Sequence, residues 1–402
     1  GPVGDVPKIS EHAKHVDAGG RFVMPGMTEA HAHLSFNDSH PFGLGMPTGE
    51  DAMMAGVRNA RLMLGVGFTS AVSFGSTYKV DIHLRDSIND GKLIGPRLRA
   101  AGRDLGTTAC NIDSPGGLSQ IADGPWAMRK AVREQRKDCV DIVKLFTDGE
   151  ALSKIAPPGE LSFTDEEVEA AVDEAHRRHM RVAVHARTAG AVKQALRAGI
   201  DFIGHANYLD DEALAMLKAA RDKVFVGPAI AWEVTFLEHC ESLGYPLELV
   251  KERGYEREVQ ASIEGVPKME KAGIRLLVGG DYGISIAPHG TYAKDLEYFT
   301  DMFGMTPGRA LLCATRDGGI AFDPDGSVGT LEDGKFADLL MVDGNPLEDI
   351  TVLQDHSRIN AVMKGGQVYT GLADPTIYDT DPADLFPVDA PMPKKKVLEA
   401  AE

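Results

Sequence analysis

Histidine and aspartate residues that can bind a metal ion end several separate apolar runs of this sequence. His31 and His33 close the first run, and residues two apart on a strand point to the same side, so both imidazoles can face one point. His185, His205 and Asp281 each follow a later apolar run. Any one of them alone would be explained as a core histidine or a helix N-cap. Together they predict a metal site, because imidazole and carboxylate groups are common ligands of catalytic divalent ions.

Lys144 lies in the middle of an apolar run, residues 142–146. Strand alternation places its side chain on the face opposite Val143 and Leu145. An unpaired buried ammonium is costly, so such a lysine is paired, shifted in pKa or chemically modified. The plainer alternative is a lysine whose side chain extends along the strand to solvent. If the amine is neutral it can react with carbon dioxide, and the resulting carbamate has two oxygens that suit a bridge between two metal ions.

These residues need a fold that brings the ends of distant strands together. Short β-branched runs alternate with amphipathic stretches, which is typical of βαβ units and a parallel sheet. The predicted strands are Met27–Leu34, Phe68–Phe74, Arg97–Gly102, Asp141–Phe146, Val182–His185, Asp201–His205, Val224–Pro228 and Ile274–Gly279. Eight strand and helix pairs over about 250 residues match the α/β class and a (β/α)8 TIM barrel, whose enzymes build their sites at the carboxyl ends of the strands.

Helices are predicted between these strands and after them. Thr164 with Glu167 three residues later forms a capping-box pattern at the start of one of them. The predicted helices are Glu50–Leu64, Pro125–Lys137, Thr164–Arg178, Gly190–Ala198, Asp211–Ala220, Leu247–Ala272, Thr291–Phe303 and Pro307–Thr315. Residues 102–117 are rich in Gly, Thr and Ser and are interpreted as a loop that lines the pocket.

The pattern changes to short strands and turns from Gly326 onward. We expect residues 326–372 to share a small β-sandwich with residues 1–22, which leaves residues 23–325 for the barrel. Residues 373–402 are rich in Pro and Asp and contain three consecutive lysines. This last segment is too polar to bury alone, so it is interpreted as a solvated tail or as an arm on a neighbouring subunit.

Composition excludes several classes of protein. The chain has 402 residues, of which 43% are hydrophobic and 25% charged, so it is globular and long enough for a large core. The net charge of −18 argues against nucleic acid or an anionic membrane as a partner. No apolar run reaches the roughly 18 residues of a membrane span, and the four cysteines form no C-x-x-C pair. We expect a cytoplasmic protein, and an exported form stays open because the start of the chain looks incomplete.

The sequence resembles the amidohydrolase superfamily of metal-dependent hydrolases. The resemblance rests on residues 25–33, Pro-Gly-Met-Thr-Glu-Ala-His-Ala-His, and on residues 328–340 near the end of the chain. Between them, the four residues already singled out occur in the family's order: Lys144, His185, His205 and Asp281. Within the superfamily the chain is similar to the imidazolonepropionase-like branch, which includes Xaa-Pro dipeptidases, ochratoxin-cleaving amidases, and molinate and phenylurea hydrolases.

This resemblance implies a barrel capped by the β-sandwich and a centre of two divalent metal ions, zinc in the first place, with cobalt or manganese as alternatives. It implies one ion held by His31, His33 and Asp281 and another held by His185 and His205. Carboxylated Lys144 would bridge the two ions.

Some positions depart from the superfamily's patterns. Glu29 stands where many members have Asp, which argues against close kinship with the hydantoinases. Residues 315–319, Thr-Arg-Asp-Gly-Gly, replace the usual turn after the last helix. Thr188 stands where mononuclear deaminases have Glu. Hydrolysis is therefore favoured over deamination.

The predicted reaction is hydrolysis of an amide. Two metal ions acidify a bridging water, and Asp281 accepts its proton and passes it to the leaving nitrogen. The substrate is expected to be a small amide with an apolar or aromatic part, such as an N-acyl amino acid, a dipeptide or a carbamate-type xenobiotic. A lactonase or phosphotriesterase-like hydrolase is the alternative, and a barrel that serves only in assembly is a weaker one. We expect a homo-oligomer.

The candidates for substrate binding are residues in the loops after the strands. Arg187 could pair with a substrate carboxylate, with a surface salt bridge as the alternative. Tyr208 and His289 could donate to the carbonyl oxygen, and His289 could instead hold its loop. Tyr282, Phe36 and Trp232 would supply apolar walls. The polar loop residues Arg103, Cys110 and Asn111 are further candidates.

Overall fold

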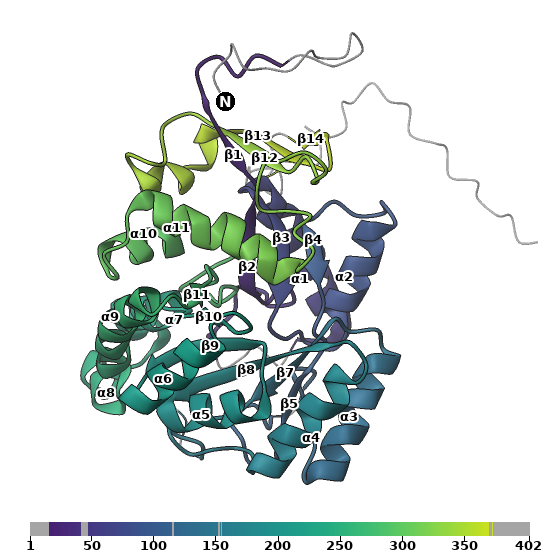
Figure 1. Ribbon diagram of the computed structural model, residues 1–402, viewed down its shortest axis with the longest axis vertical. Helices are drawn as coiled ribbons and strands as arrows, with labels where there is room; N and C mark the ends of the chain where they lie inside the picture. Colours follow the sequence, from purple (N-terminus) through teal and green to yellow (C-terminus); the bar gives the residue numbers. More distant parts are fainter. Residues whose placement is uncertain are drawn as a thin grey trace, which may run out of the picture.

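A computed structural model describes residues 16–41, 47–114, 116–151, 153, 155–369 and 372 of the chain. Strands occupy the interior of the main body and helices lie around them, with a smaller sheet at one end (Figure 1). Residues 1–15 of the predicted N-terminal sandwich segment and the predicted tail at 373–402 lie outside the described residues.

Parallel strands make up the main body, so the predicted α/β class is confirmed. One sheet has seven strands in the order β11-β10-β9-β8-β7-β5-β6, and another has three in the order β2-β3-β4. Every recorded pairing within these two sheets is parallel. The strands are β2 (Met27–Ala32), β3 (Phe68–Ser73), β4 (Arg97–Arg99), β5 (Asp104–Gly106), β6 (Ser119–Ile121), β7 (Ile142–Phe146), β8 (Arg181–Thr188), β9 (Phe202–Tyr208), β10 (Phe225–Gly227) and β11 (Arg275–Leu276). β2, β3 and β7 are buried along their whole length, as expected for strands covered on both faces.

Backbone hydrogen bonds also join the two parallel sheets to each other. Ala30 N in β2 donates to Val278 O just after β11, at 3.0 Å. Ile142 N in β7 donates to Ala100 O just after β4, at 3.2 Å. The three-stranded sheet is therefore hydrogen-bonded to the seven-stranded sheet at two places, in β7 and just after β11.

Helices alternate with the strands. They are α1 (Gly49–Gly65), α2 (Val80–Asn89), α3 (Pro125–Lys137), α4 (Asp165–His176), α5 (Ala189–Ala198), α6 (Asp211–Ala220), α7 (Ala231–His239), α8 (Leu247–Arg253), α9 (Tyr255–Lys271), α10 (Lys294–Asp301), α11 (Pro307–Leu312) and α12 (Gly318–Phe322). The predicted capping box is confirmed, since Thr164 and Glu167 each bond the other's backbone N–H at the start of α4. Within the described chain, no helix combines the length and apolar character needed to cross a membrane.

Several predicted elements differ from the structure in extent. The strands predicted to end at His185 and His205 continue to Thr188 and Tyr208. The single helix predicted over residues 247–272 is two helices, because Gly254 has φ +117°, a conformation that ends a helix and that glycine adopts readily. The strand predicted over residues 274–279 is regular only in β11, although Leu277 N still donates to Val226 O and Val278 O still accepts from Ala30 N. The loop predicted over residues 102–117 contains β5, which pairs with β6 and β7.

A four-stranded antiparallel sheet lies beside this main body. Its order is β1-β12-β13-β14, with β1 (Phe22–Pro25), β12 (Leu339–Val342), β13 (Ile359–Lys364) and β14 (Gln367–Tyr369). β1 pairs with β12 from Phe22 opposite Val342 to Pro25 opposite Leu339, so segments from the two halves of the chain share one sheet. The predicted domain boundary between residues 22 and 23 falls inside β1.

Candidate metal centre

A cavity of about 270 Å³ lies where the carboxyl ends of β2, β7 and β8 meet. It contains five of the six predicted metal ligands, and the sixth, His205, lies beside two of them with ring centroids 5.2 Å from His31 and 4.4 Å from His185. The described residues that line it are His31, His33, Phe36, Pro41, Asp104, Asn111, Ile112, Ser114, Leu118, Lys144, Phe146, Glu150, His185, Trp232, Tyr255 and Asp281. Residues far apart in sequence thus converge on one space.

His31, His33 and Asp281 form the tightest group of possible ligands. One donor atom from each lies within 4.8 Å of the others. Asp281 Oδ1 is 3.1 Å from His33 Nε2 and 3.8 Å from His31 Nε2. His33 Nδ1 lies 3.0 Å from the Gly75 carbonyl oxygen, which can only accept, so Nδ1 donates to it and Nε2 is the nitrogen that faces Asp281. A histidine ligand held in this way through its other nitrogen is typical of metal sites.

Buried nitrogens without hydrogen-bond partners support the fit to metal ions. Among the described residues, His31 Nδ1, His185 Nε2 and both ring nitrogens of His205 make no hydrogen bond. Buried polar groups are normally paired, so this concentration of unpaired nitrogens needs an explanation. Imidazoles are frequent ligands of divalent ions, and the donor set therefore fits the group that the sequence predicts.

The protonation states agree with metal binding. Burial lowers the pKa values of His31, His185 and His205 well below their ordinary value, with Lys144 and Arg187 acting in the same direction. Burial would raise the pKa of Asp281, but His31 and His33 outweigh it and hold that pKa well below its usual range. Neutral imidazoles and an ionised carboxylate are the forms that bind a metal ion.

Lys144 does not reach solvent, so the alternative of a solvent-reaching lysine is wrong. Its side chain is 2% exposed, its Nζ donates to Phe74 O at 3.2 Å, and Asp104 Oδ2 lies 4.0 Å away. Burial lowers the pKa of the Lys144 amine, although Asp104 and Asp281 oppose the shift. A lowered pKa increases the neutral fraction, which is the form that can react with carbon dioxide.

Backbone conformation and ring packing hold the ligands in place. His205, Ala206 and Asp281 have φ values of +79°, +54° and +62°, in the left-handed region that costs about 1–3 kcal/mol for such residues. The His33 ring stacks on Phe36 with centroids 4.4 Å apart, and the His185 ring stacks on Phe146 at 3.8 Å. The fold thus accepts local strain and uses aromatic contacts to fix the directions of these side chains.

Asp104 and Glu150 line the same cavity, and neither was predicted from the sequence. Asp104 is 4% exposed, and burial raises its pKa to about 6. Burial also raises the pKa of Glu150, to about 7, although Arg187 lowers it. Asp104 lies in the segment interpreted as a loop, and only the pairing of β5 with β7 brings it next to Lys144. Glu150 follows no apolar run directly, so no local signal marks it.

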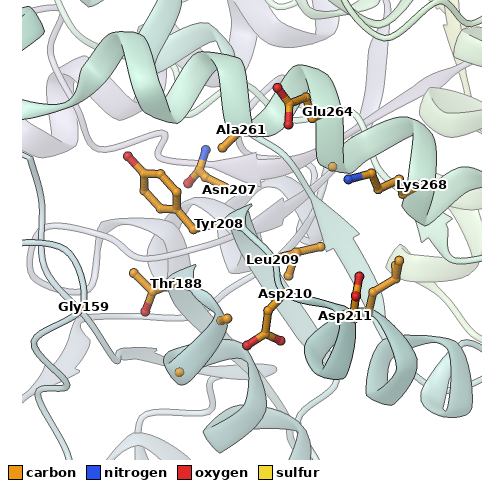
Figure 2. A pocket seen from close by; sticks show the side chains of 14 residues that line it. Gly159, Thr188, Asn207, Tyr208, Leu209, Asp210, Asp211, Ala261, Glu264 and Lys268 are labelled. Atoms are coloured by element: carbon orange, nitrogen blue, oxygen red, sulfur yellow. The ribbon is translucent and has the colours of Figure 1, made fainter.

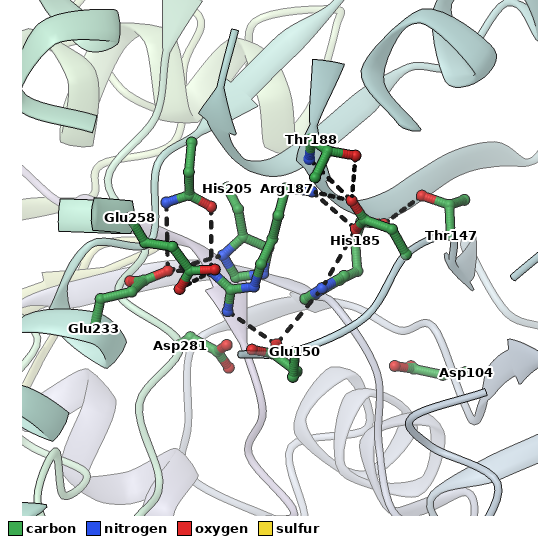
Figure 3. A network of polar contacts seen from close by, with 12 residues as sticks. Asp104, Thr147, Glu150, His185, Arg187, Thr188, His205, Glu233, Glu258 and Asp281 are labelled. Atoms are coloured by element: carbon green, nitrogen blue, oxygen red, sulfur yellow. Dashed lines mark hydrogen bonds and ion pairs between the residues drawn. The ribbon is translucent and has the colours of Figure 1, made fainter. Parts of the chain in front are cut away.

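Arg187 is fully buried, so the alternative of a surface salt bridge is wrong. Its guanidinium donates to Glu150 Oε1 at 2.9 Å, to Asn207 Oδ1 at 3.2 Å and to Glu233 (Figure 3). It is not among the described residues that line the metal-ligand cavity. Pairing with a substrate carboxylate stays a prediction for this residue.

The other predicted substrate-binding residues lie away from this cavity. Tyr208 lines a separate cavity of about 500 Å³ between β9, α5, α6 and α9 (Figure 2), where its hydroxyl donates to Gly254 O at 3.4 Å. Tyr282 lines a third cavity beside α7 and α10. His289 Nε2 donates to Phe36 O at 3.1 Å, and its Nδ1 accepts from the Tyr292 hydroxyl at 2.7 Å. His289 therefore holds its loop, and substrate contacts by these three residues stay predictions.

Three of the further candidates do line the metal-ligand cavity. Phe36 and Trp232 contribute apolar surface and Asn111 contributes an amide. Cys110 is buried in a small apolar cluster with Ile112 and Phe146, and Arg103 lines a different cavity beside α1 and α2. The cavity with the metal ligands therefore combines polar groups with aromatic side chains.

Known proteins resemble this chain over most of its length. The model of the amidohydrolase family matches residues 22–369. Ochratoxinase from Aspergillus niger is 28% identical over 381 residues, which span 87% of this chain and 76% of that protein. The crystal structure of an Xaa-Pro dipeptidase with methionine in its active site is 31% identical, with a TM-score of 0.77 and 87% of each chain covered. The crystal structure of a prolidase complexed with N-methylphosphonate-L-proline is 26% identical, with a TM-score of 0.81 and 91% of each chain covered. The resemblance inferred from the sequence is confirmed, and the chain belongs to the amidohydrolase family.

Proposed function

We propose that this enzyme is a binuclear metal-dependent hydrolase that cleaves a C–N amide bond. The observation that carries the proposal is the convergence of His31, His33 and Asp281 within 4.8 Å of one another, with His185 and His205 packed beside them. Lys144, buried in the same cavity, would carry the carboxylate that bridges the ions. Membership of the amidohydrolase family supports this assignment.

Different residues of the chain would have different roles in hydrolysis. When bound, two divalent ions, with zinc as the first choice, would supply an acidified water and a Lewis acid at the scissile carbonyl. Asp281 is ionised and lies in the cavity wall, so it can accept a proton from the attacking water and return it to the leaving nitrogen. The phenyl rings stacked on His33 and His185 keep these imidazoles in one orientation during turnover.

The fold proposed for this centre is a (β/α)8 barrel with a β-sandwich. Support for the barrel comes from the bonds Ala30 N to Val278 O and Ile142 N to Ala100 O, which connect the two parallel sheets at two places. Support for the sandwich comes from the pairing of β1 with β12. We also propose that the chain forms a homo-oligomer.

The cavity suits a small amide with an aromatic or apolar part. Phe36, Phe146, Trp232 and Tyr255 line it, and its volume of about 270 Å³ suits a compact ligand. The names of the relatives, ochratoxinase and Xaa-Pro dipeptidase, point to N-acyl amino acids and dipeptides as the first compounds to test.

The test has a metal arm and a substrate arm. Metal analysis of the zinc-loaded protein should give two ions per chain, and carbon-13 NMR after labelling with bicarbonate should give a carbamate signal that Lys144→Ala lacks. Matched amide, ester and phosphotriester substrates should then be hydrolysed in favour of the amide, and a chelator should abolish turnover. Two bound ions with turnover of the ester or phosphotriester alone would reject amide hydrolysis and favour the lactonase or phosphotriesterase alternative.

A further inference from the structure

A buried ionic cluster lies directly behind two of the proposed metal ligands. Its centre is Arg187, whose guanidinium is completely enclosed by protein. Three carboxylates from three elements face it: Glu150 from the segment after β7, Glu233 from α7 and Glu258 from α9. Figure 3 shows the guanidinium between Glu150 on one side and Glu233 and Glu258 on the other. Burying three acids around one cation is expensive, so the arrangement needs a reason beyond stability.

Two of these carboxylates face the outer nitrogens of metal ligands. Glu150 Oε1 lies 3.5 Å from His185 Nε2 while it accepts from Arg187 Nη2 at 2.9 Å. Glu233 Oε1 lies 3.9 Å from His205 Nδ1 while it pairs with Arg187 Nη1. Neither contact is a hydrogen bond in the structure, so both nitrogens still lack a hydrogen-bond partner. If these carboxylates support the rings, Nδ1 of His185 and Nε2 of His205 would be the nitrogens that bind a metal ion. A carboxylate behind a histidine ligand fixes the ring and raises its basicity.

The other pair of histidines does not use this cluster. His33 is held through Gly75 O and lies next to Asp281, and His31 Nε2 also faces Asp281. No ion pair or hydrogen bond recorded for the described residues connects His31 or His33 with Glu150, Glu233 or Arg187. The two halves of the proposed centre therefore have separate supports.

Arg187 is what keeps the two carboxylates in place. Of the lysine and arginine side chains that the structure describes, only Arg187 lies within ion-pair distance of Glu150, Glu233 or Glu258. Its planar fork donates to two carboxylates at once, which a lysine cannot do with the same geometry. Without the guanidinium, Glu150 and Glu233 would repel each other and move from their positions behind the imidazoles.

We propose that Arg187 is a positioning residue that holds Glu150 and Glu233 behind His185 and His205, and so sets the affinity of one metal site without acting on the other. The inference rests on the binuclear centre of the proposed function. It also assigns Arg187 a role different from the pairing with a substrate carboxylate that the sequence suggests.

The test is a zinc titration of the metal-free full chain in competition with a chromophoric chelator. The parent should bind two ions, and Arg187→Met should weaken one site by about 10- to 100-fold and leave the other unchanged. Arg187→Lys should recover only part of the loss. Arg181→Met is the matched control, because Arg181 lies on the same strand and donates to the carbonyls of Ala321 and Phe322, far from the cluster. It should bind both ions like the parent.

A second variant covers the case in which Arg187→Met does not fold. The double change Glu150→Gln with Glu233→Gln keeps Arg187 opposite Glu258, so the buried charge stays balanced, and it should weaken the same single site. In either weakened background, adding His33→Ala should abolish the remaining site and adding His205→Ala should not. Equal weakening of both sites, or of neither, would overturn the inference and leave the proposed function standing. A parent chain that binds fewer than two ions would overturn both.

Discussion

Gly279 offers the sharpest test of how the chain brings its metal ligands together. This residue lies two positions before Asp281, and its N–H donates to Asp295 Oδ2 at 2.9 Å. A Cβ added at Gly279 would lie 2.5 Å from His31 N, 2.9 Å from His31 Cβ and 3.0 Å from Glu29 Oε1. The nearest atom belongs to the backbone of β2 and cannot rotate away. Gly279 is therefore a position where the segment that carries Asp281 passes close to His31.

The size of the effect of Gly279→Ala follows from these distances. An ordinary contact needs 3.4–4 Å, so the methyl group would push β2 and the Asp281 segment apart by about 1 Å. Overpacking of this kind costs about 1–3 kcal/mol. We also expect weaker binding of zinc, because the shift would separate His31 from Asp281, whose facing atoms are now 3.8 Å apart.

Thermal unfolding of the metal-free chain and a zinc titration measure the two effects separately. Unfolding entropy is about 2.1 cal/mol/K per residue, so in this chain of 402 residues a cost of 1 kcal/mol lowers the melting temperature by about 1 °C, and a fall of about 1–4 °C is expected. Gly227→Ala in β10 is the matched control, because its Cβ would meet only Leu277 O at 3.9 Å. The control should stay within about 0.5 kcal/mol of the parent. A Gly279→Ala chain as stable as this control, with unchanged zinc affinity, would refute the packing argument.

Three further predictions use other parts of the molecule. Burial lowers the pKa of His289 to about 4, whereas a histidine in the unfolded chain has a pKa near 6.5. Between these two pH values the unfolded chain therefore binds more protons than the folded one. The free energy of unfolding should fall by up to about 3 kcal/mol as the pH drops from about 6.5 to 4. Urea unfolding between pH 7 and 4 should show this loss in the parent and a flatter profile in His289→Gln; identical profiles would contradict it. Asp281→Asn should lower kcat by about 10²- to 10⁴-fold, the contribution of a general base, as measured on the best amide substrate; turnover equal to that of the parent would remove Asp281 from the mechanism. Thr164→Ala removes the side-chain cap of α4 and should cost about 0.5–2 kcal/mol in the same urea measurement, whereas Thr108→Ala, an exposed loop position, should cost less.

The proposed metal ligands could be picked out from the sequence because their signals are local. His31, His185 and His205 each lie at or near the end of an apolar run, and the ends of parallel strands meet at one edge of a sheet. Lys144 stood out because a charge inside a buried strand is rare. The alternation of strands and helices likewise follows from residue patterns within short windows, as the capped start of α4 illustrates.

The residues around these ligands were decided only by tertiary structure. Asp104 comes next to Lys144 through the pairing of β5 with β7, and Arg187 is buried because acids from α7, α9 and the segment after β7 surround it. Tyr208 was expected at the site but lines a separate cavity. It lies three residues after His205 on β9, and residues three apart on a strand face opposite sides. The left-handed backbone at His205 also changes the direction of the chain. The amino-acid sequence by itself determined which side chains can bind metal ions and which strands carry them. Which partners stand behind those side chains, and which walls enclose them, depended on contacts between distant segments, because hydrophobic periodicity records whether a residue is buried but not what it is buried against.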